Sequence, residues 1–408
     1  MASPGTLAEL QRVIRRIEAR SRPVPPDPRR AAAIQEAVGG TVMETDAGPL
    51  LVVTRRYPLD QPHGAQPLAG AAVLAPESLA VLARAQCLPV ASPRLLYLDT
   101  ETTGLAGGTG TYAFLVGVGF VDGDAFEVRQ YFMRDLDEEP ALLAALGELL
   151  GRFDGLVTYN GTSFDLPLLE TRFILSRRRW PADAFHLDLL LPARRIWSGH
   201  LDDCRLASVE RHALSVEREG DIAGALIPYV YFDWLRHKRP GQLPRVFEHN
   251  RLDILSLAAL AAWVTAALAR APADDLPPIE LAGLGWIWEL ADAERAAACY
   301  RAALELGLAG AARERVVGRL ARGEKRQARW QDARELWSML AREQERFDHR
   351  PWEEVAKIDE HRHRDLGAAR DVVEEALARA RSAGVGPQIM AALDHRLARL
   401  RRRLQALA

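Results

Sequence analysis

Runs of large apolar residues predict a sheet in the first half of the chain. Residues 94–98 (RLLYL) read as a short buried strand, and the runs at 111–121 and 125–133 read as two more. Gly123 lies between the last two runs, where a glycine signals a hairpin. We therefore expect a meander of three adjacent strands.

The next apolar runs predict a strand and two helices. Residues 155–159 read as a strand that ends at the turn signal Asn160-Gly161. Pro167 suits the first turn of a helix that opens after this signal, because its missing N–H is not needed there. The apolar run 254–269 contains two hydroxyl residues and is shorter than about 18 residues, so we interpret it as a buried helix rather than a membrane span.

The last third of the chain is rich in Ala, Arg, Leu and Glu and predicts helices throughout. A small residue followed by a large residue four positions later occurs from Ala296, from Ala333 and from Ala369, at intervals of 37 and 36 residues. Such pairs suit the close packing of neighbouring helices. The pattern resembles tetratricopeptide repeats, whose period is about 34 residues, and a plain helical bundle with Ala-rich similarity is the alternative.

Composition permits several folded domains and shows no signature of a strongly basic nucleic-acid binder. The 408 residues are 48% hydrophobic and carry a net charge of −2, although positive charge can still gather near one groove. Three widely separated cysteines favour neither a disulfide framework nor a zinc site. The first residues lack the apolar core of a signal peptide, so we expect a cytoplasmic protein without a membrane.

Changes in composition divide the chain into three expected parts. Residues 1–90 hold an amphipathic helix and a small β appendage, residues 91–271 hold the sheet, and residues 279–408 form an all-α helical-repeat domain after a proline-rich linker. The expected fold class of the middle part is α/β, with a mixed sheet flanked by helices. Helical repeats commonly bind peptides on a concave face, so we expect a protein partner for the last part.

Four acidic residues stand inside apolar frames, where strands end or helices begin. Asp99 and Glu101 lie at the carboxyl end of the first strand, before Thr102-Thr103-Gly104 break it into a turn, and they alternate along it, so both point to one side. Asp165 lies at a strand-to-helix junction, and His249 precedes Asp253 by one helical turn. Taken singly, a solvated turn, an N-cap or a helix-start contact explains each acid. Taken together, acids in buried segments predict one carboxylate cluster that binds Mg²⁺ or Mn²⁺, because oxygen ligands select these ions.

The three acidic segments together resemble the DEDD superfamily of 3′–5′ exonucleases, which have the ribonuclease H-like fold. The motifs are DTETTG from Asp99, YNGTSFD up to Asp165, and HNRLD from His249 to Asp253. Beyond the acids, residues 94–269 are similar to the bacterial YprB-type ribonuclease H-like proteins through HLDLLLPARRIW, CRLASVE and IPYVYFDWL. The resemblance implies an α/β ribonuclease H-like domain.

The resemblance also implies the residues of an active site. Asp99, Glu101, Asp165 and Asp253 become the metal-binding acids, and His249 becomes the general base. Two ions about 4 Å apart would activate a water and stabilise the leaving 3′ oxygen. The reaction would release nucleoside 5′-monophosphates from a 3′ end. His249 stands four residues before Asp253, which is the spacing of the tyrosine branch, whereas the histidine branch uses five.

Substrate contacts are expected at Thr102 and Asn160, within the first two motifs, and at Arg194 and Arg195. A solvated helix face is the alternative for the two arginines. The expected partner is single-stranded or 3′-ended DNA or RNA. Two other functions stay open, namely an interaction scaffold that binds nucleic acid with little turnover and a structure-selective endonuclease on the same fold.

Two further groups of residues have structural interpretations that compete with functional ones. The run Arg177–Arg179 could hold phosphates, and a solvated helix face is the alternative. Tyr231 and Trp234 could stack on bases, but together with Ile227 they have helical core spacing, so we interpret them as core residues.

Overall fold

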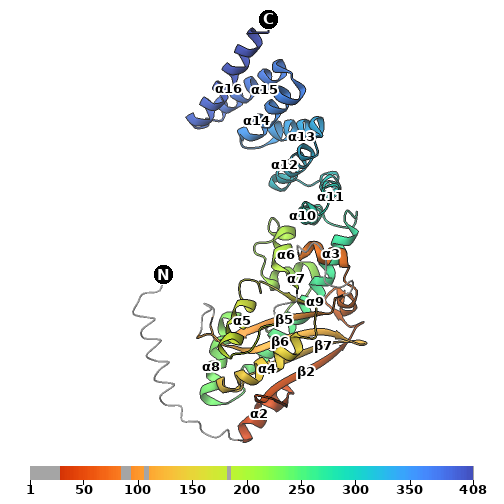
Figure 1. Cartoon of the computed structure of the whole chain (residues 1–408), viewed down its shortest axis with the longest axis vertical. Coiled ribbons are helices and arrows are strands. Elements are labelled where there is room, and N and C mark those ends of the chain that lie inside the picture. The colour runs from red at the N-terminus through yellow and green to blue at the C-terminus, as the bar shows by residue number, and fades with distance from the viewer. Residues whose placement is uncertain (1–27, 84–92, 105–109, 182–184, 408) are drawn as a thin grey trace, which may run out of the picture. The chain divides into compact units, whose positions relative to one another are not determined.

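The computed structural model describes residues 28–83, 93–104, 110–181 and 185–407. The helix expected in residues 1–22 lies outside these ranges. A mixed seven-stranded sheet with helices is followed by a region of helices only, which confirms the expected fold class (Figure 1). The strand order is β1-β2-β7-β6-β5-β8-β9; β5 pairs with β8 in parallel, while the pairs β1–β2, β2–β7, β7–β6 and β6–β5 are antiparallel.

The elements have the following bounds. The strands are β1 (Thr41–Thr45), β2 (Gly48–Pro58), β3 (Pro62–His63), β4 (Gln66–Pro67), β5 (Leu95–Thr102), β6 (Ala113–Asp122), β7 (Ala125–Phe132), β8 (Gly155–Thr158) and β9 (Phe185–Asp188). The helices up to the end of the sheet region are α2 (Pro28–Val38), α3 (Pro76–Leu82), α4 (Glu139–Leu150), α5 (Asp165–Leu175), α6 (Leu190–Trp197), α7 (Leu206–Leu214), α8 (Ile227–His237) and α9 (Leu243–Arg270). The remaining helices are α10 (Pro278–Trp288), α11 (Ala293–Glu305), α12 (Gly310–Arg326), α13 (Trp330–Glu343), α14 (His349–Ile358), α15 (Leu366–Ser382) and α16 (Pro387–Gln405).

The predicted meander is confirmed by β5, β6 and β7, and Gly123 makes the hairpin turn with a φ of 62°. β5 runs from Leu95 to Thr102, so Asp99 and Glu101 lie near its carboxyl end, as predicted. β6 pairs with β5 as far as Thr102, with a register shift after Glu101.

Two glycines of β6 let α9 approach the sheet closely. A Cβ atom on Gly117 would lie 2.1 Å from Asn250 Oδ1, and one on Gly119 would lie 2.4 Å from Ile254 Cγ2. Gln130 of β7 donates from Nε2 to the Phe247 carbonyl at 2.8 Å and to Asn250 Oδ1 at 2.9 Å. The start of α9 is therefore fixed over β6, with a polar contact where the glycines leave room.

Tyr231 and Trp234 of α8 belong to the core, as predicted. The Tyr231 ring stacks on the Phe114 ring with centroids 3.9 Å apart, and Trp234 donates from Nε1 to the Arg134 carbonyl. The long helix α9 is apolar enough to cross a membrane by length and composition, but 72% of its most apolar window is buried. Burial of this kind is expected of a core helix.

The chain divides into two compact units. The first contains the described residues within 1–61, 94–184 and 218–257, and the second contains those within 62–93, 185–217 and 258–408. The four predicted acids all fall in the first unit. The expected domain bounds of 91–271 and 279–408 stay predictions.

Within the second unit, α10 packs directly on α6. A Cβ atom on Gly283 would lie 2.3 Å from Ile196 Cα, so only a glycine allows this approach. Trp197 donates from Nε1 to the buried Glu280 Oε1 at 3.0 Å. These contacts join the helical region to α6 through a buried surface.

The repeated pattern in the helical region falls on α11, α13 and α15. Its small residues Ala296, Ala333 and Ala369 are buried, as are the large residues that follow each of them. This confirms a packing role for the pattern. The assignment to tetratricopeptide repeats stays a prediction.

Candidate metal centre

Three elements bring the four predicted acids together. Asp99 and Glu101 stand opposite Gly117 and Leu115 in the register of β5 and β6, and therefore on one face of the sheet. Asp165 begins α5, and Asp253 lies on α9. Ligand oxygens of Glu101 and Asp253 lie within 4.8 Å of each other, and the charges of Asp165 and Asp253 raise the pKa of Asp99 and that of Glu101.

Burial and like charge act together on the two carboxylates of β5. Burial is the largest cause that holds the pKa of Asp99 and that of Glu101 well above their ordinary values, and repulsion by the neighbouring carboxylates adds to it. Asn250 and Arg218 oppose this shift at Asp99. A cluster of this kind becomes stable in its ionised form when a cation compensates it.

The donor set fits a divalent cation. Glu101 Oε1 is buried and accepts no hydrogen bond from the part of the chain that the structure describes. Glu101, His249 and Asp253 each offer one ligand atom within 4.8 Å of the others. Carboxylate oxygens at such distances suit Mg²⁺ or Mn²⁺, and a bound ion would satisfy the unpartnered oxygen.

Neighbouring polar side chains hold two of the acids in place. Asn250 donates from Nδ2 to Asp99 Oδ2 at 2.9 Å and is itself held by Gln130. Thr100 donates its hydroxyl to Asp165 Oδ1 at 2.5 Å. The orientation of each carboxylate is therefore set by a hydrogen bond from the core, as is usual around metal ligands.

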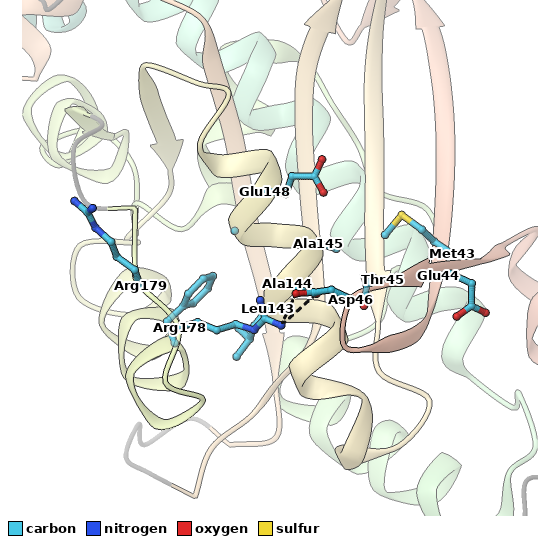
Figure 2. A pocket seen from close by; sticks show the side chains of 12 residues that line it. Met43, Glu44, Thr45, Asp46, Leu143, Ala144, Ala145, Glu148, Arg178 and Arg179 are labelled. Atoms are coloured by element: carbon cyan, nitrogen blue, oxygen red, sulfur yellow. Dashed lines mark hydrogen bonds and ion pairs between the residues drawn. The ribbon is translucent and has the colours of Figure 1, made fainter.

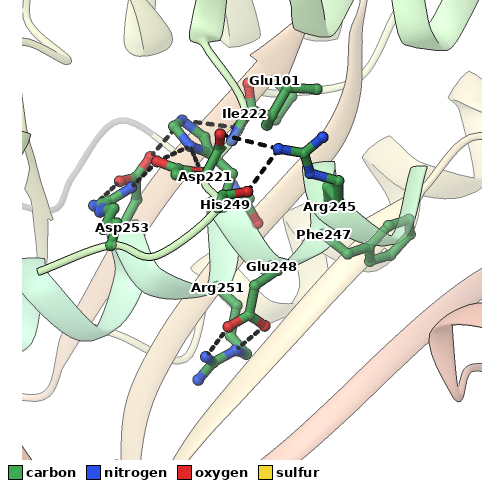
Figure 3. A network of polar contacts seen from close by, with 12 residues as sticks. Glu101, Asp221, Ile222, Arg245, Phe247, Glu248, His249, Arg251 and Asp253 are labelled. Atoms are coloured by element: carbon green, nitrogen blue, oxygen red, sulfur yellow. Dashed lines mark hydrogen bonds and ion pairs between the residues drawn. The ribbon is translucent and has the colours of Figure 1, made fainter. Parts of the chain in front are cut away.

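His249 lies between Asp221 and the acid cluster (Figure 3). Its Nδ1 is 2.8 Å from Asp221 Oδ1 and 3.0 Å from Oδ2. Its Nε2 is 3.5 Å from Asp253 Oδ2 and 4.0 Å from Glu101 Oε1. A carboxylate at Nδ1 favours the tautomer with a proton on that nitrogen, so the lone pair of Nε2 faces the cluster.

Arg218 and Asp221 complete the network from one loop. Arg218 has a side chain that is only 7% exposed, and its Nη2 donates to Asp253 Oδ1 at 2.5 Å. Burial raises the pKa of Asp221, but the hydrogen bond with His249 and the charges of His249 and Arg218 outweigh it, so the pKa is lowered overall. Arg245 fixes this loop by donating to the carbonyls of Gly220 and Asp221 (Figure 3).

Sequence reasoning missed Arg218, Asp221 and Asn250. The first two lie in a loop without periodicity, and no apolar frame marks them. Asn250 follows His249 directly, which is not a spacing that places two residues on one helix face. Its contact with Asp99 depends on the close approach at Gly117, which only the packed structure reveals.

The expected substrate contacts lie in different surroundings. Thr102 is buried and donates its hydroxyl to the Gly104 carbonyl, and Asn160 sits in the turn after β8 with a φ of 66°. Arg194 and Arg195 lie on α6, in the second unit. The four predicted substrate contacts therefore belong to two different units.

A separate cavity of about 540 Å³ lies in the first unit between β1, α4 and the segment after α5 (Figure 2). Arg178 reaches across it to Asp46, with 3.3 Å between Nη2 and Oδ1. None of the clustered acids lines this cavity. The ion pair gives Arg178 a structural contact, and both interpretations of residues 177–179 stay predictions.

Comparison with known proteins agrees with this fold. Residues 96–265 match the RNase H superfamily. The uncharacterized protein YprB of Bacillus subtilis (strain 168) is 32% identical over 317 residues, which cover 76% of this chain and 75% of YprB. This chain belongs to the YprB family. The resemblance to ribonuclease H-like, YprB-type proteins is thereby confirmed. This member of the YprB family carries an RNase H-like domain. Members of that superfamily are typically nucleases that act on nucleic acid with divalent metal ions.

One solved structure with detectable likeness is the family B DNA polymerase from the hyperthermophilic archaeon Pyrobaculum calidifontis. The TM-score is 0.36 at 16% identity, over 58% of this chain and 29% of the polymerase chain. Likeness at this level carries no argument about the activity of the YprB family.

Proposed function

We propose that this protein is a metal-dependent 3′–5′ exonuclease that hydrolyses phosphodiester bonds of DNA or RNA. The observation that supports this most strongly is the meeting of Asp99, Glu101, Asp165 and Asp253 from three elements, with a buried Glu101 oxygen that lacks a donor. A fold alone does not fix an activity, so the proposal rests on this site. A cytoplasmic location and a protein partner for the helical region remain predictions from composition and repeat pattern.

The four acids would hold two Mg²⁺ or Mn²⁺ ions. Bound there, the ions would supply charge stabilisation for the phosphodiester and lower the pKa of the attacking water. Asp99 and Asp165 offer carboxylates whose orientation is already set by Asn250 and Thr100. Preset ligands reduce the reorganisation that the reaction would otherwise require.

His249 would accept the proton of the attacking water at Nε2. Asp221 holds Nδ1 and so keeps the basic nitrogen facing Asp253 and Glu101. The four-residue spacing to Asp253 suits this task, since it places both side chains on one face of α9. His249 is therefore the proposed general base, and Asp221 is the residue that positions it.

Arg218 would hold the phosphate undergoing hydrolysis. Its buried guanidinium contacts Asp253, and its charge lowers the pKa of Asp99. A planar guanidinium binds phosphate oxygens through two parallel donors. Cations bound by the acids would neutralise Asp253 in place of Arg218, so the guanidinium could bind a phosphate.

Digestion of labelled single strands tests the proposal. DNA and RNA oligonucleotides labelled at the 5′ end or the 3′ end are incubated with the full-length protein and Mn²⁺, Mg²⁺ or EDTA. A 3′–5′ exonuclease shortens 5′-labelled strands in steps and releases 5′-mononucleotides only when metal is present. Internal cuts at defined structures would favour the endonuclease, and tight binding without cleavage would favour the scaffold.

A further inference from the structure

Four arginines of α12 form a stripe along one helix face. Arg315, Arg319, Arg322 and Arg326 follow each other at intervals of four, three and four residues. Residues with this spacing share a face of an α-helix, and the eleven steps from the first to the last arginine extend over about 16 Å. We call these four residues the arginine stripe.

An exposed tryptophan lies against the stripe. Trp286 of α10 is 37% exposed, and the Arg319 guanidinium carbon is 4.0 Å from the centroid of its ring. The Arg195 guanidinium carbon from α6 lies 5.7 Å from the same centroid. A second tryptophan, Trp337, lies 6.0 Å from Arg322. Trp337 is buried, so Trp286 is the ring beside the stripe that solvent can reach.

The surface continues from the stripe to α6. A Cβ atom on Gly199, just after α6, would lie 2.7 Å from Arg315 Nη2, so the guanidinium rests on that turn. Arg194, Arg195 and Trp286 share the lining of a hollow of about 490 Å³. Two acids, Asp202 and Asp203, also line it, and Asp203 is engaged by the Ser208 hydroxyl and the Arg205 backbone N–H.

The charges of the stripe are mostly unbalanced. Arg319 pairs with Glu289 at 2.9 Å, but Arg315, Arg322 and Arg326 have no ion pair within the described residues. By contrast, Arg313 on the same helix but off the stripe pairs with Glu343. Burial and then the charge of Arg319 lower the pKa of Arg322. Positive charges held close together on a surface favour the binding of a polyanion.

We propose that Arg194, Arg195, Trp286 and the arginine stripe form a binding surface for single-stranded nucleic acid, with guanidinium groups on phosphates and the Trp286 ring stacked on a base. The choice of ligand rests on the proposed function. Charge favours any polyanion, but an exposed indole flanked by arginines favours one that carries flat bases. A single strand presents its bases for stacking, whereas a duplex does not.

Binding without catalysis tests this surface. A 5′-labelled thirty-nucleotide single strand is titrated with full-length protein in EDTA, at several salt concentrations, and anisotropy is recorded. The double variant Arg315→Glu, Arg322→Glu should bind at least about tenfold more weakly, with a salt slope reduced by roughly one for each phosphate that the variant no longer binds. Trp286→Leu should weaken binding several-fold without a change in the salt slope, because it removes stacking and no charge.

The matched control is Arg346→Glu, Arg402→Glu, which changes the net charge equally at exposed arginines away from the stripe. Its affinity should stay close to that of the unchanged protein, and all variants should unfold at similar temperatures. Equal affinities for the folded stripe variant and the control would overturn the proposal. Displacement of the strand by polyglutamate of matched charge, at equal concentration, would also overturn it, because the surface would then select charge alone. Cleavage of a hexanucleotide with Mn²⁺ is measured beside binding, so that failure of this surface and failure of the proposed exonuclease are told apart.

Discussion

The acid cluster of the first unit and the arginine stripe of the second are both gatherings of like charge, and they differ in burial. Glu101 is buried and Asp99 is half-buried, so their charges need a compensating cation small enough to bind between them. Arg315 and Arg326 are exposed, so their charges are tolerated in water and are available to a large anion. The comparison indicates that burial decides whether a cluster of like charge selects a metal ion or a polymer.

The largest expected effect is loss of hydrolysis in Asp165→Asn. The change removes one charge with little change of shape, and stabilisation by a metal ion is worth several kcal/mol, which corresponds to about 10³-fold in rate. The hydrolysis rate of a labelled single strand with Mn²⁺ is the measurement. Asp124→Asn, on the exposed hairpin turn, is the control and should keep the full rate. A folded Asp165→Asn protein that cleaves normally would rule out this acid as a metal ligand.

His249→Ala should lower the rate by about 10² to 10⁴, the usual contribution of a general base. Asp221→Asn should lower it less, roughly 10-fold to 10²-fold, because the imidazole remains but loses the partner at Nδ1. Both variants should bind Mn²⁺ as tightly as the unchanged protein. Asp221→Glu should restore part of the rate and the pH–rate profile, which a structural role alone would not explain. An unaltered rate and profile in Asp221→Asn would remove Asp221 from the mechanism.

Gly117→Ala tests the acid cluster through Asn250, which contacts Gly117 and donates to Asp99. The new methyl group would lie 2.1 Å from Asn250 Oδ1 and force its amide away from Asp99. We expect roughly tenfold slower hydrolysis and about 1–3 kcal/mol lower stability, as for overpacked cores. Gly220→Ala is not a suitable control because of its positive φ, whereas Gly323→Ala is, since its Cβ would meet no atom within 4 Å. Full activity in Gly117→Ala would show that Asn250 does not orient Asp99.

The smallest expected effect is on thermal stability. The pKa of Glu101 is raised in the folded state, so the folded protein holds this proton more tightly than the unfolded chain does. The resulting contribution to the free energy of unfolding is complete below the ordinary pKa of 4.5, and it is lost as the pH rises through the raised value. Glu101→Gln should therefore raise the melting temperature of the metal-free protein by about 2–4 °C near neutral pH, which corresponds to roughly 1 kcal/mol, with no gain at pH 4. Mn²⁺ should raise the melting temperature of the unchanged protein more as pH rises, and it should raise that of the Glu101→Gln variant by a smaller amount. A lower melting temperature in the variant would contradict the claim that the charges of the acid cluster are uncompensated without metal.

The sequence predicted the acid cluster but not the network around it. Asp99, Asp165 and Asp253 were recognisable because each interrupts an apolar frame, and buried acids are rare enough to carry information. The arginine stripe gave no such signal, because 53 lysines and arginines are spread along the chain and most helices of the last part contain several. The contacts of Arg218 and Asn250 depend on how a loop and a helix pack against the sheet. Local patterns do not encode such distances.

In the fold too, some features follow from the local sequence and others depend on tertiary packing. The meander and the strand before Asn160 followed from apolar runs and turn residues, both of which are local. The register shift between β5 and β6 after Glu101 depends on the pairing of the two strands, which no single run reveals. The close packing of α10 on α6 required Gly283, whose role appears only when the two helices are seen together.

The most direct test of the central claim is the rate of single-strand hydrolysis as Mn²⁺ is titrated into metal-free protein, with Asp165→Asn measured in parallel. We expect no hydrolysis without metal, a rise to a saturating rate in the unchanged protein, and at least about 10³-fold less in the variant at every concentration. Hydrolysis that proceeds equally in EDTA, or equally in both proteins at saturating Mn²⁺, would contradict metal-dependent hydrolysis at this site.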